Sequence, residues 1–198
     1  MFTIKQSVGI TGGIGSGKTY VARILESMGY PVFYSDQVSK SLLATSPEII
    51  KAVTKLLGTK AYFEDGTVNK AYVAGKIFSD QDLLLQMNAI MHPAVRNAFQ
   101  TFFKNQNAPL VFNEAAILFE TGAHENLDKT ILVVAPEKVR IERVLKRENI
   151  SIAQVKERIE KQWADEKKLA LSDYIIKNGN NDMLLPQINE ILQSLLNS

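Results

Sequence analysis

Cysteine is absent from this sequence of 198 residues, and the chain has only two histidines and one tryptophan. The absence of cysteine excludes disulfide bonds, thiolate metal sites and cysteine nucleophiles. No apolar run approaches the roughly 20 residues that a membrane-spanning helix needs, so we expect no membrane partner. The formal net charge is only +2, which gives no reason to expect a nucleic-acid partner.

The length of the chain and its first residues set the remaining general expectations. A chain of 198 residues has the size of one domain, so we expect a single domain over residues 1–198. The first six residues run directly into an expected strand and leave no room for a signal peptide, so we expect a cytoplasmic protein. A monomer and a small homo-oligomer both remain open.

The strongest signal is a glycine-rich segment near the N-terminus. Its residues are Gly12, Gly13, Ile14, Gly15, Ser16, Gly17, Lys18 and Thr19. They match G-x-x-x-x-G-K-T, the phosphate-binding loop of nucleoside triphosphate enzymes. A short apolar run before the loop predicts a buried strand, and the apolar spacing over residues 20–28 predicts a helix after it. Strand, loop and helix occur in the order that the motif requires.

The residue types of this loop suit triphosphate chemistry. Glycines allow successive backbone N–H groups to turn inward around phosphate oxygens, next to the positive end of the following helix. Lys18 is expected to reach the β- and γ-phosphates of ATP, and the Thr19 hydroxyl to ligate Mg²⁺. Tyr20, the next residue, is assigned to the nucleotide site. The alternative is a glycine-rich turn without function, which the correct flanking elements disfavour.

Strands that alternate with helices predict an α/β fold. We expect a five-stranded parallel sheet in the three-layer P-loop NTPase fold. The expected strands cover residues 8–10, 31–35, 109–113, 130–135 and 173–177. The expected core comprises residues 1–45, 107–135 and 171–198. Parallel strands of this kind bring their carboxyl ends to one edge of the sheet, where ligands bind.

Two carboxylates follow expected strands at that edge. Asp36 comes after the second strand, where it could accept a proton from an attacking hydroxyl or orient that hydroxyl. The alternative for Asp36 is a capping role at a helix that starts near Gln37. Glu114 ends the third strand and is a candidate to act on magnesium, directly or through water.

Residues 46–106 are predicted to form a helical insertion between the second and third strands. The segment is longer than an ordinary crossover and is expected to bind the second substrate, with a purely structural layer as the alternative. We expect a helix start at Ser46, a cap at Ser79 and a helix break at His92 and Pro93. Without further context, His92 is more simply a buried histidine than a catalytic one.

Residues 136–170 are predicted to form a helical lid. Arg140, Arg143 and Arg147 have the spacing of one helix face. Arginines on a closing lid would stabilise charge on a transferring phosphoryl group and exclude water. The alternative is a solvated helical hairpin with charge pairs along its surface.

Motifs that the sequence lacks exclude two other classes of phosphate-loop protein. The guanine-binding pattern N-K-x-D is absent, since Asn69 and Lys70 are followed by Tyr72 at the fourth position. No D-x-x-G pattern of a GTPase switch follows the third strand, and no L-S-G-G-Q signature of a transporter ATPase occurs. The remaining pattern fits a kinase of a small hydroxyl-bearing molecule.

Taken in order, the motifs resemble those of the dephospho-coenzyme A kinase family from end to end. The loop match begins at Thr11 and is longer than the generic pattern. The other matching residues are Asp36, Lys40, Asp65, Gly66, Lys70, His92, Pro93, Ile117, Leu118, Phe119, Glu120, Arg143, Arg147, Arg158, Gln162, Asp173 and Asn178. The order and spacing of the matches carry the resemblance, rather than any single match.

The chain departs from the family pattern at four positions. Tyr34 replaces the first aspartate of D-A-D, and Ala116 replaces the proline before L-L-F-E. Lys40 and Lys70 stand where the family motifs have arginine. Lysine keeps the charge but lacks the bidentate geometry of arginine toward phosphate.

The resemblance implies transfer of the ATP γ-phosphate to the ribose 3′-hydroxyl of dephospho-coenzyme A. It implies catalytic roles for Lys18, Asp36 and Arg143, and it implies Arg147 and Asn178 near the nucleotide. The residues it implies for binding the acceptor are Asp36, Lys40, Lys70, His92 and Glu120. ATP and Mg²⁺ are the implied cofactors, with Thr19 as the metal ligand. A nucleoside or nucleoside-monophosphate kinase, or a non-catalytic nucleotide-binding regulator, is the alternative.

Overall fold

The structure is a computed structural model that describes residues 5–197. The chain divides into two units: a sheet unit, up to Tyr34 and from Asn105 onward, and a helical unit, Ser35–Lys104. The helical unit therefore begins earlier than residue 46, because the helix after the second strand packs with the helices that follow it. Among the described residues, no helix combines the length and apolar character needed to cross a bilayer.

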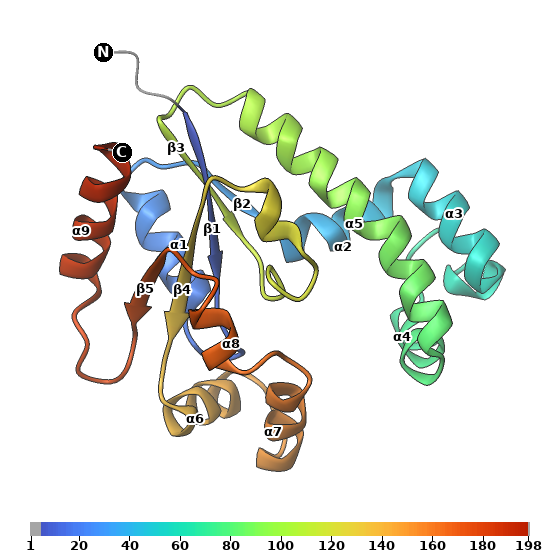
Figure 1. The fold of residues 1–198 in the computed structure, drawn as a ribbon. Helices are drawn as coiled ribbons and strands as arrows, with labels where there is room; N and C mark the ends of the chain where they lie inside the picture. The colour runs from blue at the N-terminus through green and yellow to red at the C-terminus, as the bar shows by residue number, and fades with distance from the viewer. Residues whose placement is uncertain (1–4, 198) are drawn as a thin grey trace. The chain divides into compact units, whose positions relative to one another are not determined.

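A parallel sheet forms the centre of the sheet unit (Figure 1). Its strands are β1 (Gln6–Thr11), β2 (Val32–Tyr34), β3 (Leu110–Glu114), β4 (Lys129–Val134) and β5 (Tyr174–Lys177). The strand order is β2-β3-β1-β4-β5, and every neighbouring pair is parallel. Over the described residues, the prediction of a five-stranded parallel sheet in an α/β fold is confirmed.

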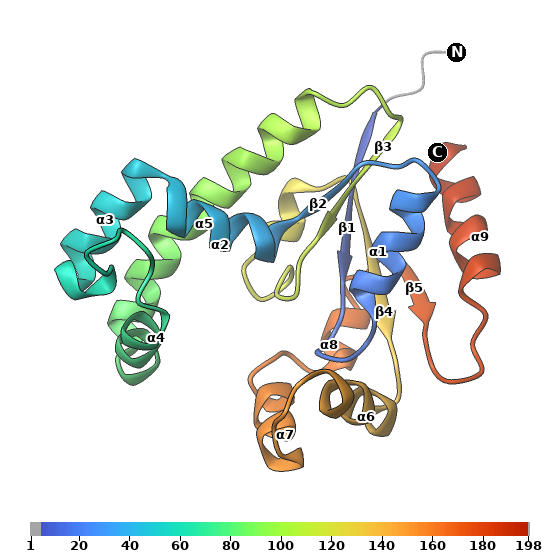
Figure 2. The ribbon, with the colours of Figure 1, turned by 180° about the vertical axis from the view of Figure 1, so that it is seen from behind.

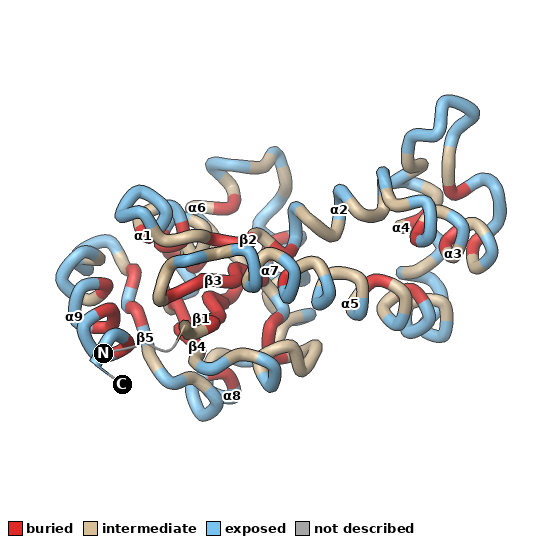
Figure 3. The backbone as a smooth tube through the Cα atoms, turned by 90° about the horizontal axis from the view of Figure 1, so that it is seen from above, coloured by how far each residue is buried: buried red, intermediate tan, exposed pale blue. Residues whose placement is uncertain are grey.

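Both faces of the sheet are covered, which explains why its strands are apolar runs rather than alternating patterns. Helices α1 (Lys18–Ser27) and α9 (Leu184–Leu196) lie side by side on one face (Figure 2). Residues 115–127 and the short helix α8 (Asp165–Leu169) lie on the other. Figure 3 shows buried stretches along the central strands β1, β3 and β4. This burial holds the carboxyl ends of the strands in fixed positions.

The expected lid, residues 136–170, contains α6 (Glu137–Arg147), α7 (Ile152–Glu160) and α8. The 3₁₀ helix η2 (Ala123–Asn126) lies before it in the chain, between β3 and β4. Helix α7 begins with a capping box, in which the Ser151 hydroxyl accepts the Gln154 N–H and the Gln154 side chain accepts the Ser151 N–H. Pro136 is the N-cap of α6, which starts at Glu137.

The helical unit has a core of its own. Its elements are α2 (Ser35–Thr45), α3 (Pro47–Leu57), the 3₁₀ helix η1 (Thr59–Ala61), α4 (Lys70–Ser79) and α5 (Gln81–Lys104). Its buried apolar residues are Ile49, Val53, Leu57, Ala61, Val73, Met87 and Met91. The expected helix start at Ser46 is confirmed, because its hydroxyl accepts the Ile49 N–H.

Two expectations for this unit were wrong. Helix α5 continues through His92 and Pro93 instead of breaking there. A proline removes only one backbone donor, and α5 packs against α2, α3 and α4, so tertiary contacts outweigh the local cost. Ser79 ends α4 and does not cap α5; the Asp80 carboxylate instead accepts the N–H groups of Asp82 and Leu83.

Candidate active site

The phosphate-binding loop lies between β1 and α1, as expected. Gly17 is the N-cap of α1 and has a φ of 91°, which favours glycine. Helix α1 starts at Lys18, so the free N–H groups of its first turn and its positive end face the loop. A loop of this form, at the start of a ten-residue helix, is suited to hold a phosphate group.

The loop also packs closely against α6. Gly15 has a φ of 78°, and a Cβ atom at this position would overlap the backbone carbonyl of Arg140. A Cβ atom at Gly13 would overlap the guanidinium group of the same arginine. Glycine is therefore needed at position 15 for both its backbone angle and its contact with α6.

Glu114 lies beside the start of α1. Strands β1 and β3 pair with Ile10 opposite Glu114, which brings the carboxylate to the end of β1. The Thr19 hydroxyl donates a hydrogen bond of 3.0 Å to Oε1 of Glu114. The Nζ atom of Lys18 lies 3.7 Å from the same oxygen, and only 5% of the Glu114 side chain is exposed. A cation, a hydroxyl and a buried carboxylate thus meet at the phosphate loop.

This group of side chains fits a magnesium ion bound together with phosphate. Mg²⁺ prefers hard oxygen ligands and commonly takes one or two from the protein and the others from phosphates and water. Thr19 and Glu114 place two such oxygens 3.0 Å apart. The part of the chain that the structure describes has no group of three or more His, Cys, Asp or Glu side chains that could hold a metal alone.

The carbonyl oxygen of Ser16 receives two donors from outside the loop. The Asn178 side chain donates through Nδ2 at 2.7 Å, and Arg143 donates through Nη1 at 3.4 Å. Asn178 is itself held after β5, because its backbone N–H donates to the carbonyl of Val134. Asn178, predicted near the nucleotide, and Arg143, predicted as catalytic, are therefore in direct contact with the loop.

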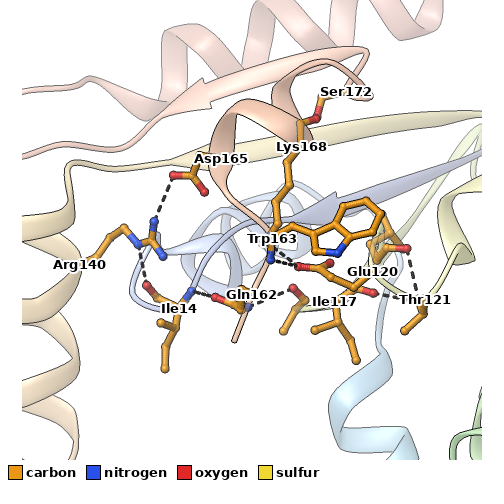
Figure 4. A network of polar contacts seen from close by, with 12 residues as sticks. Ile14, Ile117, Glu120, Thr121, Arg140, Gln162, Trp163, Asp165, Lys168 and Ser172 are labelled. Carbon is orange, nitrogen blue, oxygen red and sulfur yellow. Dashed lines mark hydrogen bonds and ion pairs between the residues drawn. The ribbon is translucent and has the colours of Figure 1, made fainter. Parts of the chain in front are cut away.

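Ile14, at the apex of the loop, is bonded through both of its backbone polar atoms (Figure 4). Its N–H donates to Oε1 of Gln162 at 2.7 Å, and its carbonyl accepts from Nε of Arg140 at 2.9 Å. Arg140 is buried and forms an ion pair of 3.1 Å with Asp165. The Gln162 side chain also donates to the carbonyl of Ala116 at 3.4 Å.

Glu120 lies deeper in the same network. Its Oε1 atom accepts the backbone N–H of Trp163 at 3.2 Å and lies 2.8 Å from Nζ of Lys168. The Lys168 side chain is fully buried, while the neighbouring Lys167 lies over the Trp163 ring. Oε2 of Glu120 is buried and has no hydrogen-bond partner within residues 5–197.

Tyr34, one of the departures from the family pattern, lies opposite Glu114 in the pairing of β2 with β3. Its hydroxyl donates to Oε2 of Glu26 at 3.2 Å. Burial raises the pKa of Tyr34 to about 12, and the carboxylates of Glu26 and Glu114 act in the same direction. This position is therefore a neutral hydroxyl at physiological pH, where the family motif has a carboxylate.

Two predicted nucleotide-site residues point toward solvent. Arg147 is exposed and pairs at 2.6 Å with Glu148, which also binds Arg158. Hydrogen bonds from Arg147 and Arg158 lower the pKa of Glu148 and keep it ionised. Tyr20 is 61% exposed. Of the three arginines predicted on one face, Arg140 and Arg143 contact the loop, whereas Arg147 bonds to Glu148.

The remaining predicted residues belong to the helical unit. Asp36 and Lys40 are both exposed and lie four residues apart on α2, which places them on one side of that helix. Helix α2 begins at Ser35, so Asp36 lies in its first turn instead of preceding the helix as the capping alternative assumed. Lys70 is exposed at the start of α4.

His92 is half-buried on α5. Burial lowers its pKa below the usual value of 6.5, and the positive charge of Arg96 lowers it further. The imidazole is therefore neutral at pH 7 and can offer one donor and one acceptor to a ligand, rather than a positive charge.

Sequence reasoning missed part of the site. Lys168 lies in the run Asp165–Leu169, whose charges resemble an exposed helix face, so nothing in the pattern indicated a fully buried ammonium group. The contact of Arg140 with the loop was also missed. Arg140 and Arg143 are three residues apart on α6 and therefore share a helix face, which could have indicated that both contact the loop.

Comparison with known proteins identifies relatives that match most of the chain. The profile of the dephospho-CoA kinase family matches residues 6–183. The dephospho-CoA kinase of Bacteroides fragilis is 38% identical over 189 residues, which cover 95% of this chain and 92% of the relative.

Two solved structures are also similar. A crystal structure from Thermus thermophilus has a TM-score of 0.84 at 31% identity and covers 98% of this chain and 97% of that one. The dephospho-CoA kinase from Campylobacter jejuni has a TM-score of 0.71 at 22% identity, covers 98% of both chains and shares the fold. From the family match and the Bacteroides relative, this chain belongs to the dephospho-CoA kinase family.

Proposed function

We propose that the protein uses ATP to phosphorylate the ribose 3′-hydroxyl of dephospho-coenzyme A and so produces coenzyme A. The family assignment supports this reaction. The observation that carries it is the meeting of Lys18, Thr19 and Glu114 at the phosphate loop. No observation favours a nucleoside kinase, a nucleoside-monophosphate kinase or a regulator without catalysis.

The nucleotide side of the proposed reaction uses the sheet unit. Lys18 and the loop amides bind the β- and γ-phosphates, and Arg143 stabilises charge on the phosphoryl group during transfer. Asn178 and Arg147 belong to the nucleotide site. Magnesium, held by Thr19 with Glu114 beside it, supplies charge neutralisation between the β- and γ-phosphates when bound.

The acceptor side uses the helical unit. Asp36 accepts the proton of the 3′-hydroxyl or orients that hydroxyl. The hydroxyl oxygen forms a bond to the γ-phosphorus, and the bond from that phosphorus to the β,γ-bridging oxygen breaks. Lys40 and Lys70 supply positive charge for the anionic acceptor, and neutral His92 supplies a hydrogen bond. Glu120 is also assigned to the acceptor side.

The proposal extends to the organisation of the chain. Residues 1–198 act as one kinase domain with an acceptor-binding insertion over residues 46–106 and a lid over residues 136–170. The protein works in the cytoplasm without a nucleic-acid or membrane partner, as a monomer or small homo-oligomer. The composition and the modest charge support this setting.

A coupled assay of ADP release tests the function. Dephospho-coenzyme A should give turnover well above that with nucleosides or nucleoside monophosphates. Lys18→Ala should lower kcat/KM by about 10²-fold or more, because it removes a charge that acts on the transferring phosphoryl group. Lys51→Ala, an exposed lysine on α3, is the matched control and should keep full activity. Unchanged turnover in Lys18→Ala would contradict the proposal.

A further inference from the structure

The apex of the phosphate loop is bound to a segment that lies far away in the sequence. The N–H of Ile14 donates to the side chain of Gln162, 148 positions along the chain, at 2.7 Å. Gln162 lies in the connection between α7 and α8 and belongs to neither a helix nor a strand. Its position must come from the contacts of the segment that carries it.

Three of those contacts lead to the segment that follows β3. The Gln162 side chain donates to the carbonyl of Ala116, and the next residue, Trp163, donates its N–H to Glu120. Glu120 is in turn paired at 2.8 Å with Lys168, whose side chain is fully buried. Breaking a buried ion pair leaves an uncompensated charge and is strongly destabilising. The pair therefore anchors the segment from Gln162 to Lys168 to the segment that follows β3.

The bond from Gln162 also determines which loop amides remain for a ligand. The Ile14 N–H is directed to Oε1 of Gln162 at 2.7 Å, and its carbonyl is directed to Arg140 at 2.9 Å. These two hydrogen bonds hold the peptide units on either side of Ile14, so neither unit can rotate without breaking one of them. The Ser16 N–H donates to the carbonyl of Gly13 at 3.0 Å, so the N–H groups of Gly15, Gly17, Lys18 and Thr19 are those that can face phosphate.

We infer that Gln162 is a positioning residue for the nucleotide site. It acts through Ile14 to hold the phosphate loop in its binding conformation before ATP arrives, and the Glu120–Lys168 pair holds Gln162 in place. A loop ordered in advance loses less conformational entropy on binding, so the advantage is a higher ATP affinity. The inference rests on the proposed function, because ATP is the ligand that the loop is prepared for.

Gln162→Met tests this inference in the full-length protein. Methionine has a similar shape but offers no strong acceptor to the Ile14 N–H. Amide hydrogen exchange at Ile14, followed by NMR without nucleotide, should accelerate about two- to tenfold, the range expected for loss of one net hydrogen bond. The Kd for a non-hydrolysable ATP analogue with Mg²⁺ should rise within the same range, about two- to tenfold.

Two further variants separate positioning from a general loss of structure. Gln162→Glu keeps an acceptor oxygen and should restore slow exchange at Ile14. Gln154→Ala breaks the capping box of α7 without touching the loop, so it reports fraying of that helix alone. It should leave both the Ile14 exchange rate and the analogue Kd at wild-type values.

Several results would overturn the inference. They are wild-type exchange and wild-type analogue affinity in Gln162→Met, failure of Gln162→Glu to restore slow exchange, or equal effects of Gln154→Ala and Gln162→Met. These measurements use no acceptor substrate and no turnover. A failure of the proposed function would instead appear as unchanged activity in Lys18→Ala, so the two failures are distinguishable.

Discussion

The sheet unit and the helical unit hold their predicted functional residues in opposite ways. In the sheet unit, the Thr19 hydroxyl donates a hydrogen bond to the buried Glu114. The N–H and the carbonyl of Ile14 are both hydrogen-bonded to side chains. In the helical unit, Asp36, Lys40 and Lys70 are exposed to solvent. Long exposed side chains keep their rotamer freedom until a ligand orders them. We therefore expect a nucleotide side that is ordered in advance and an acceptor side that becomes ordered with its substrate.

Two of the four departures from the family motif lie in the helical unit, and the other two, Tyr34 and Ala116, lie in the sheet unit outside the phosphate loop. Lys40 and Lys70 stand in place of arginines in the helical unit, whereas every residue of the loop from Thr11 to Thr19 keeps the family pattern. Lysine is a flexible point charge, and arginine binds phosphate through two parallel hydrogen bonds. An exposed acceptor site can exchange one for the other more easily than a packed loop can exchange its glycines.

The largest expected effect comes from Asp36→Asn. If Asp36 handles the acceptor proton, kcat should fall by about 10²- to 10⁴-fold, while the Kd for the ATP analogue stays unchanged. Asp82→Asn is the matched control, since both residues are exposed acids in the first turn of a helix in the same unit. Steady-state kinetics and thermal unfolding check this prediction. Equal kcat in the two variants, with only a small loss of Tm, would show that Asp36 merely stabilises its helix.

A second prediction compares two glycines with nearly the same backbone angle, one in each unit. Gly15 has a φ of 78° and Gly66 a φ of 81°, but only Gly15 has atoms close to the position of a Cβ. Gly66→Ala should cost about 1–2 kcal/mol of unfolding free energy through backbone strain alone. Gly15→Ala adds overlap with the backbone of Arg140 and should cost about 2–5 kcal/mol in total.

Denaturant unfolding of the two alanine variants measures this difference, and binding of the ATP analogue provides a second measure. Gly15→Ala should also weaken analogue binding, whereas Gly66→Ala should leave it unchanged. Equal losses of stability and equal analogue affinity would mean that the loop does not pack on α6 as closely as the structure shows.

The smallest expected effect concerns His92 and pH. The folded-state pKa of His92 lies below 6.5, so between these two values the unfolded chain binds more protons than the folded one. The unfolding free energy should therefore fall as the pH is lowered from above 6.5 through the folded-state pKa. His92→Gln should flatten this part of the pH profile relative to wild type. The measurement is urea unfolding across the range, with pH 8 as the internal reference because His92 is neutral in both states there.

Local patterns predicted much of the fold. The apolar runs identified the strands, and the glycine loop between the first strand and the first helix identified the phosphate site. Local patterns failed at Pro93, because the packing of α5 outweighs the loss of a single backbone donor. They also failed at Ser79, because the neighbouring Asp80 caps α5 instead. Errors of this kind arise where two local signals compete and only packing decides between them.

The sequence by itself determined the chemistry of this protein. Glycines at fixed spacing, a lysine and a threonine specify a phosphate site wherever the chain places them. Only the tertiary structure decided the partners of these residues. It brought Glu114 to Thr19, 95 positions away, Gln162 to Ile14, and a fully buried Lys168 to Glu120. The physical reason is that a local pattern reports propensity and spacing, whereas partners distant in the sequence are selected by the burial and register of the whole sheet.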